Sequence, residues 1–523
     1  MAFVSAMSAT KTGVNGATVF TEEGVGDTRV SLFTMLTRGL EPAYIEDAVA
    51  RVFATGDEAA IEDLFVMAFQ TRDVRGGKGE RALFYAMMAA LYKHRAPTVL
   101  DLLHLVPEYG CWRDLWELHR RIPNTEFRRA IYALVKRQLA DDSCAVRPSL
   151  LAKWLPREGS KTYRGLAACL ADALYPDMYA GRCRMASYRR LIAGLNRRLD
   201  TPEIHMCDGT WSDIKPAHVP GRSRMLHNEA FLNLNANGHG IRHPHSEDRM
   251  CCRNNFLEHL AAVKAGHATM KGANVVQPHE IVQRLSQRYL DADSRDVLEA
   301  QWSSIRDAVV AAGGFRRAVA MCDFSGSMAG TPMTVSKALG ILISETTAPA
   351  FRDHVLTFST TPVWHSFRSC ATMTDKIQSI GRAGVGLSTD FYRACMMILE
   401  RLVASSVPVG EEPEDLIVLT DMGWDAANAA ATDKQTIIQR IRAEFAAAGN
   451  WKMPRIIVWN LRAEYKDFQA RAVEEGVVMV SGWSPNILAA LVKNGVRTMT
   501  PLEGLRAALD VPRYDAVRQV VRA

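Results

Sequence analysis

The chain has 523 residues, of which 48% are apolar and 23% charged, and its formal net charge is +6. This length predicts two or more domains, and no apolar run reaches the roughly 18 residues that a membrane span needs. Its ten cysteines form no CxxC pair, which argues against a zinc ribbon or a disulfide framework and favours reduced thiols. We expect a cytoplasmic protein with no membrane partner.

The N-terminal part is predicted to be helical. We expect a tail over residues 1–30 and an α-helical domain over residues 31–312, interrupted by a loop-rich insert at 205–250. In segments such as AIEDLFVMAFQTRDV, apolar residues recur at three- and four-residue spacing, and short polar or proline-bearing connections separate the segments. Many consecutive helices with short links predict an all-α, HEAT-like helical repeat.

Basic residues are concentrated in this helical part. Residues 113–198 hold 18 Lys and Arg against 8 Asp and Glu, a local excess of 18 − 8 = +10. Clustered guanidinium groups bind phosphates well, and a Gly-rich turn before a helix offers backbone amides to the same anion. A solvated helical face is the alternative. The candidate phosphate and RNA ligands are Arg72, Arg75, Lys78, Arg81, Arg113, Arg120, Arg121, Arg128 and Arg129.

After Gly313-Gly314 the pattern changes to short β-rich runs that alternate with helical ones. Continuously apolar strands separated by helices predict an α/β, doubly wound and mostly parallel sheet over residues 313–523. Ligands bind beyond the carboxyl ends of such strands, near the point where the strand order reverses. The predicted strands are AVAMCD (318–323), HVLTFS (354–359), DLIVLTD (415–421), RIIVWNL (455–461) and GVVMVSG (476–482).

Oxygen-bearing side chains follow the strands of this domain. DFSGSM places Asp323, Ser325 and Ser327 directly after the first strand, and Thr389 and Asp421 follow at later strand ends or nearby loops. Carboxylate and hydroxyl ligands without His or Cys suit a hard cation, Mg²⁺ first and Mn²⁺ or Ca²⁺ as alternatives. The alternative is that Asp323 caps a helix and the serines satisfy turn amides.

The D-x-S-x-S motif with its distant Thr and Asp resembles the metal-ion-dependent adhesion site of von Willebrand factor A domains, which have a Rossmann-like fold. The resemblance implies that Ser325 and Ser327 bind the metal directly. It implies that Thr389 binds directly or through water, as do the two acidic positions Asp323 and Asp421. It also implies that an acidic side chain from a protein partner, or a phosphate, completes the coordination.

Further motifs resemble the DUF2828 family, namely TRDVRGGKGERALF (71–84), GCWRDLWEL (110–118), GTWSDIKPAHVPGRSRMLHNEAF (209–231) and VSGWSPNIL (480–488). That family looks like a relative of the TROVE-domain RNA-binding proteins typified by the Ro autoantigen. The resemblance spans residues 30 to 495. It implies a ring of helical repeats closed by the A domain, with single-stranded RNA ends in a basic central hole and structured RNA on the outer surface.

The sequence therefore predicts a non-enzymatic RNA-binding protein, part of a ribonucleoprotein, that also holds a divalent metal. Neither a Walker A loop nor a G-x-S-x-G elbow is present, and no paired carboxylates or reactive Cys–His arrangement stand out. Two alternatives stay open. One is a metal-dependent protein-interaction scaffold without RNA, and the other is a structural component of a larger phage or viral assembly.

Overall fold

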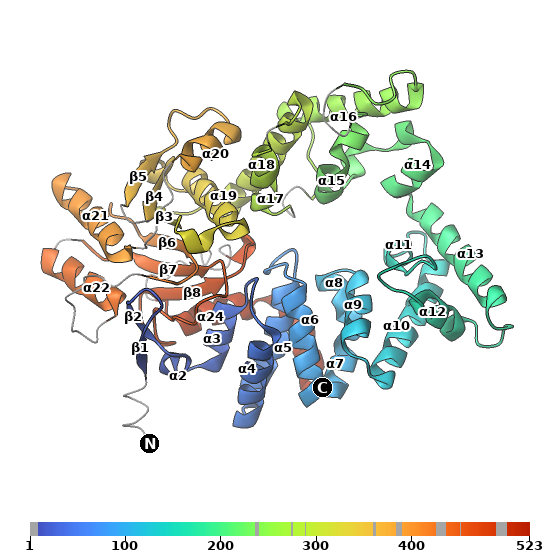
Figure 1. The fold of residues 1–523 in the computed structure, drawn as a ribbon, viewed down its shortest axis with the longest axis horizontal. Coiled ribbons are helices and arrows are strands. Elements are labelled where there is room, and N and C mark those ends of the chain that lie inside the picture. The colour runs from blue at the N-terminus through green and yellow to red at the C-terminus, as the bar shows by residue number, and fades with distance from the viewer. Residues whose placement is uncertain are drawn as a thin grey trace.

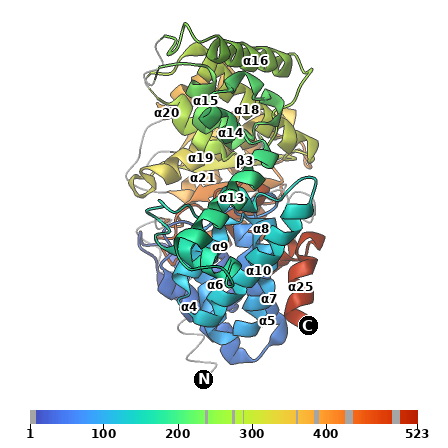
Figure 2. The same cartoon turned by 90° about the vertical axis from the view of Figure 1, so that its right-hand side faces the viewer.

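The computed structural model describes residues 9–235, 240–272, 276–287, 289–358, 362–382, 390–424, 436–449, 451–487 and 499–523. Figure 1 shows an α/β domain and an arc of helices that leaves this domain and returns to it. Viewed from the side in Figure 2, α15, α16 and α18 lie above α6, α7 and α10, and α13 lies between the two levels. None of the described helices is long and apolar enough to span a membrane.

The α/β domain is built on one six-stranded sheet with the order β5-β4-β3-β6-β7-β8. Only β5 is antiparallel to its neighbour, and the other adjacent pairs are parallel. The chain moves outward from β3 to β5 and then returns to β6, so the strand order reverses between β3 and β6. The strands are β3 (Ala318–Asp323), β4 (His354–Phe358), β5 (Val363–Ser366), β6 (Asp415–Thr420), β7 (Arg455–Asn460) and β8 (Val477–Ser481).

Helices cover both faces of this sheet, which explains why β3, β7 and β8 are buried along their whole length. In Figure 1, α21 and α22 lie on one side of the sheet, and α19 lies on the other side together with α3 and α24. The predicted α/β domain with a mostly parallel sheet is confirmed. Its helices are α19 (Thr331–Thr346), α20 (Met373–Gly381), α21 (Phe391–Ala404), α22 (Ile437–Ala448) and α24 (Pro501–Leu509).

The helical arc confirms the predicted all-α region. Its successive helices pack on one another, as α4, α5 and α6 do. They are α4 (Pro42–Thr55), α5 (Glu58–Arg72), α6 (Ala82–His94), α7 (Ala96–Asp101), α8 (Val106–Tyr109), α9 (Arg113–Arg121), α10 (Thr125–Cys144), α11 (Leu151–Trp154), α12 (Leu166–Leu174), α13 (Arg182–Leu199), α14 (Pro202–Asp208), α15 (Gly221–Phe231), α16 (Glu247–Lys264), α17 (Pro278–Leu285) and α18 (Ala292–Ala311).

Each end of the chain packs on the part of the molecule formed by the opposite end. The N-terminal segment packs on the α/β domain, and the C-terminal helix packs on the helical arc. The described residues of the expected N-terminal tail form a hairpin of β1 (Thr10–Thr12) and β2 (Thr18–Phe20), followed by α2 (Glu22–Val25) and α3 (Thr28–Met35). Helix α3 packs on β7 and β8, whereas the C-terminal α25 (Asp515–Arg522) packs on α5 and α7. The expected boundaries at residues 30 and 312 therefore separate segments that the fold joins.

The insert at 205–250 is more ordered than its composition predicts. It contains part of α14, the 3-10 turns at Trp211–Asp213 and Pro216–His218, all of α15 and the start of α16. These elements enclose a small apolar core of their own, which includes Ile214, Phe231 and Phe256. The edge strand β5 was also not predicted, because its residues Val363–Ser366 are only partly buried and show no continuous apolar run.

Candidate functional site

The predicted acidic pair lies where the strand order reverses. Asp323 is the last residue of β3, and Asp421 directly follows β6, the parallel neighbour of β3. Both side chains are fully buried. Ser325 and Ser327 lie in the turn after β3, so the structure brings four of the five expected ligands to one edge of the sheet. The fifth, Thr389, lies outside the described residues.

Hydrogen bonds hold this edge in place. Asp323 accepts from the Ser325 amide through Oδ1 (2.8 Å) and from the Thr420 hydroxyl through Oδ2 (2.9 Å). The Ser325 and Ser327 hydroxyl oxygens lie 2.9 Å apart. Asp421 Oδ1 accepts from the Gly423 amide (3.1 Å), whereas Oδ2 of Asp421 is buried and accepts no well-formed hydrogen bond from the described residues. A buried carboxylate oxygen without a donor calls for a positive partner.

The pKa shifts of Asp323 and Asp421 also indicate that this site needs a positive partner. Burial, followed by the nearby charge of Asp421, raises the pKa of Asp323 to about 7. Burial likewise raises the pKa of Asp421, against the opposing effects of Ser327 and the Gly423 amide. Both shifts arise mainly because burial disfavours the charged carboxylate, and a nearby negative charge adds to each, Asp421 for Asp323 and Glu464 for Asp421. A divalent cation would compensate these negative charges, so the residues present fit a metal ion.

The donor set is of the hard-cation type. No group of three or more His, Cys, Asp and Glu side chains suited to a metal occurs among the described residues. The site instead combines two carboxylates with two hydroxyl groups, the oxygen donors that Mg²⁺, Mn²⁺ and Ca²⁺ prefer. Two carboxylates neutralise such an ion and leave coordination positions for an external anion.

Sequence reasoning missed three residues beside this pair, all in the loop that follows β7. The Arg462 guanidinium donates to the backbone oxygen of Ser327, and its Nε pairs with Glu464 at 2.6 Å. The Tyr465 ring packs against Gly423, where a Cβ atom would come within 2.9 Å of the ring. The only sequence signal for these residues was their position after a predicted parallel strand, where the sheet rule places a site.

Two of the predicted RNA ligands are structural residues instead. Arg72 is 1% exposed, and its Nε donates to Asp114 at 2.7 Å. Lys78 is fully buried, and its Nζ donates to Phe33 O, Leu36 O and Ser481 Oγ within 3.2 Å. Neither cation faces a phosphate in solvent, so the prediction for Arg72 and Lys78 is wrong. In the sequence, the glycines and basic residues around Arg72 and Lys78 resemble a phosphate-binding loop. In the structure, this loop joins several elements of the fold instead.

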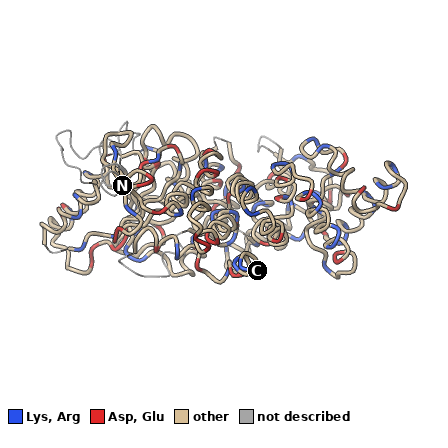
Figure 3. The backbone as a smooth tube through the Cα atoms, turned by 90° about the horizontal axis from the view of Figure 1, so that it is seen from below, with Lys and Arg blue, Asp and Glu red and all other residues tan. Residues whose placement is uncertain are grey.

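The other candidates reach solvent. Arg113 and Arg128 are half-buried, and Arg113 donates to the Tyr163 hydroxyl at 3.0 Å. The exposed ones are Arg75, Arg81, Arg120, Arg121 and Arg129. Figure 3 shows Lys and Arg interspersed with Asp and Glu along the backbone trace.

Comparison with known proteins gives three results. Residues 317–506 match the model of a domain of unknown function, DUF7788, which is not the DUF2828 model expected from the motifs. Over 501 residues the chain is 26% identical to uncharacterized protein L728 of Acanthamoeba polyphaga mimivirus, covering 90% of this chain and 84% of that protein. The crystal structure of the Deinococcus radiodurans Ro (RSR) protein is similar with a TM-score of 0.43 and 14% identity, covering 90% of this chain and 99% of that chain.

Proposed function

We propose that this chain is a non-enzymatic RNA-binding protein that also holds a divalent cation in its α/β domain. The metal half of the proposal is carried by the buried pair of Asp323 and Asp421 with its unpartnered carboxylate oxygen. The RNA half is supported by the resemblance to TROVE-domain proteins and by the exposed arginines of the helical arc. The α/β domain would then be a von Willebrand factor A domain.

Mg²⁺ would be held by Ser325 and Ser327 with the carboxylates of Asp323 and Asp421, and Thr389 would join them. The ion neutralises the acidic pair and offers its remaining positions to an acidic side chain of a protein partner or to a phosphate. Arg462, which donates to the backbone oxygen of Ser327 and pairs with Glu464, lies at the same edge. The charge of the ion itself therefore favours an anionic ligand at this site.

The metal site is tested by thermal unfolding of the full chain with and without Mg²⁺. Saturating Mg²⁺ is expected to raise the melting temperature, since a ligand at 100 times its Kd stabilises the folded state by about 2.7 kcal/mol. Asp323→Asn, which keeps the shape of the side chain, is expected to abolish the rise. Asp172→Asn, on the exposed surface of α12, is the control and keeps it. An undiminished rise in Asp323→Asn would contradict the assigned ligands.

RNA binding is tested with a stem-loop RNA that carries a single-stranded tail. Affinity is expected to fall steeply with salt, since each phosphate contact to single strands contributes about −0.7 to the slope of log K against log salt. Arg75→Glu with Arg81→Glu should weaken binding more than Arg368→Glu, an exposed control in the α/β domain. Absence of binding at low salt, with protein partners that survive nuclease but are lost with chelator, would favour the scaffold function instead.

A further inference from the structure

A hollow of about 450 Å³ lies on the helical arc between the end of α10 and the side of α13. The hollow is shallow and wide open to solvent, so a ligand in it would stay partly exposed. The hollow is formed by three separate helices, since Tyr175 comes from the end of α12. Its lining includes Ser143, Tyr175, Ser187, Arg190, Gly194 and Arg198.

Gly194 forms part of the wall of this hollow. It lies in the interior of α13, where glycine is the least favourable residue apart from proline. Apart from its chain neighbours and the nearby backbone of its own helix, no described atom lies within 4 Å of the position that a Cβ on Gly194 would take, so close packing does not require the glycine. What its missing side chain provides is free space on the wall of the hollow.

The hollow is positively charged. The 18 residues of α13 include six arginines and no acidic residue. Arg198 is held in place because Nη1 donates to the backbone oxygens of Asp142 (3.2 Å) and Ser143 (3.1 Å), which end α10. Arg190 is exposed and forms no ion pair with any described residue. A guanidinium fixed at the wall and a second one free at the rim suit a phosphate.

Aromatic rings accompany these charges. Tyr175 is half-buried in the wall, and Tyr179 in the following loop is 89% exposed. Ser187, on the lining, lies with its hydroxyl 3.6 Å from the sulfur of Met178, so the loop that carries Tyr179 borders the hollow. Exposed tyrosines beside arginines are the combination that binds the bases and backbone of single strands.

We propose that this hollow binds one unpaired nucleotide of a single-stranded RNA. The base enters beside Gly194 and lies against Tyr175 or Tyr179, while Arg190 and Arg198 contact the phosphate. Base-paired RNA does not fit, because a paired base is not free to leave its stack. The proposal rests on the proposed RNA-binding function and names a site for it that lies outside the arginines of residues 72–129.

The experiment measures binding of the full-length protein to a fluorescein-labelled oligouridylate of about 12 nucleotides, within the usual site size for single strands. Gly194→Phe fills the hollow and is expected to raise Kd about tenfold, as is Arg190→Glu, since loss of one stacked base has this magnitude. Gly194→Ala should bind like the wild type and melt at a higher temperature. Arg137→Glu makes the same charge change on the exposed face of α10 and should raise Kd much less.

The outcomes separate the two proposals. If a folded Gly194→Phe variant binds the oligouridylate with the same Kd as the wild type, the nucleotide site is overturned, whereas RNA binding by the arc is not. Absence of RNA binding by the wild type at low salt overturns both. Equal loss for Arg190→Glu and Arg137→Glu also overturns the site, because it reduces the effect to net charge. Binding of an acidic phosphopeptide at the hollow, with no RNA competition, would assign it to a protein partner instead.

Discussion

The residue that the sequence misjudged most is Lys78. In sequence it lies in a Gly-rich, basic stretch typical of a phosphate loop. In the fold, its ammonium group is buried and donates to Phe33 O (2.9 Å), Leu36 O (3.2 Å) and Ser481 Oγ (2.8 Å). Two of these acceptors are carbonyls at the end of α3, which have no partner within the helix. Lys78 therefore joins α3 to β8.

Replacing Lys78 should destabilise the protein rather than affect RNA binding alone. The Ser481 hydroxyl also reaches Phe33 O and Leu36 O but can donate to only one of them, so Lys78→Ala leaves the other buried carbonyl without a donor. We therefore expect a loss of about 2 kcal/mol in the free energy of unfolding. Arg75→Ala, an exposed change in the same loop, should stay within about 0.5 kcal/mol of the wild type. Urea unfolding followed by circular dichroism measures both. Equal stabilities would contradict the structural role of Lys78.

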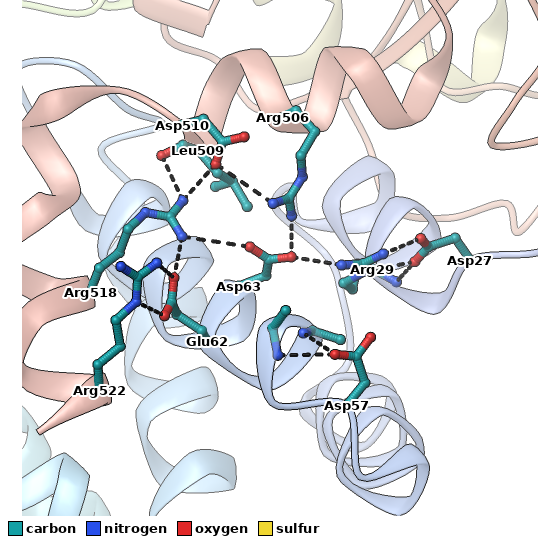
Figure 4. Close-up of polar contacts among 12 residues, drawn as sticks. Asp27, Arg29, Asp57, Glu62, Asp63, Arg506, Leu509, Asp510, Arg518 and Arg522 are labelled. Atoms are coloured by element: carbon teal, nitrogen blue, oxygen red, sulfur yellow. Dashed lines mark hydrogen bonds and ion pairs between the residues drawn. The ribbon is translucent and has the colours of Figure 1, made fainter.

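At the scale of elements, acidic residues of α5 join both ends of the chain (Figure 4). Asp63 is 1% exposed and accepts from Arg29 of α3 at 2.7 Å and from Arg506 of α24. Beside it, Glu62 accepts from Arg518 and Arg522 of α25. The network connects helices that are more than 440 positions apart in sequence, as the separation of Asp63 and Arg506 (443) shows.

Loss of Asp63 should loosen this junction. Asp63→Ala removes the carboxylate that accepts from Arg29 and Arg506 and that Arg518 faces at 3.9 Å. We expect this change to cost about 3 kcal/mol, the lower end for breaking a buried pair. The lower end applies because Arg29 keeps Asp27 and Arg506 keeps Asp510 as partners. Differential scanning calorimetry should show the loss as a lower melting temperature.

Arg522→Ala serves as the control for that measurement. Its side chain is 68% exposed, so solvent screens its pairing with Glu62 and the melting temperature should hardly change. A drop as large as that of Asp63→Ala would mean that the whole network, rather than the buried carboxylate, stabilises the junction.

At the scale of the whole molecule, the helical arc closes on the α/β domain. Helices α17 and α18 pack on α19, and α3 and α24 connect the other end of the arc to the sheet. At the seam, the His279 ring of α17 meets the Trp483 ring edge to face at 5.0 Å, and Arg38 lies 3.9 Å from the same indole ring. The arc of helices thus begins and ends against the α/β domain.

Acid is expected to weaken this seam through His279. The side chain is 4% exposed, and burial, with Arg38 and Arg222 nearby, lowers the pKa of His279 to about 3. Because its unfolded pKa is about 6.5, the unfolded chain binds the proton first and stability falls as the pH drops below that value. Between pH 7 and pH 5 this linkage costs about 2 kcal/mol.

The variant His279→Phe keeps a ring at the seam but does not titrate. Urea unfolding should therefore show that the free energy of unfolding falls from pH 7 to pH 5 by about 2 kcal/mol less in the variant than in the wild type. Glu280, which follows His279 in sequence, and Glu80, which pairs with Arg38, remain in both proteins and cancel in the comparison. If the free energy of unfolding falls equally in the wild type and in His279→Phe, His279 does not govern the response to acid.

The order of elements and the acidic edge of the sheet followed from local sequence alone. Apolar runs such as AVAMCD and DLIVLT form buried strands wherever helices cover both faces, and parallel strands necessarily bring their carboxyl ends together. Asp323, Ser325, Ser327 and Asp421 were found for this reason, since Asp323 ends a strand and the other three follow one.

Only the tertiary structure decided which charges are buried and which segments complete each half. Lys78 meets Ser481 across 403 positions, and the N-terminal hairpin pairs with the loop after β7 through Phe20 and Phe468. A basic side chain has the same local pattern whether it faces solvent or a helix end, because the acceptors that hold it come from distant parts of the chain. The roles of Arg72, Lys78 and Arg462 therefore depend on contacts that local sequence does not contain.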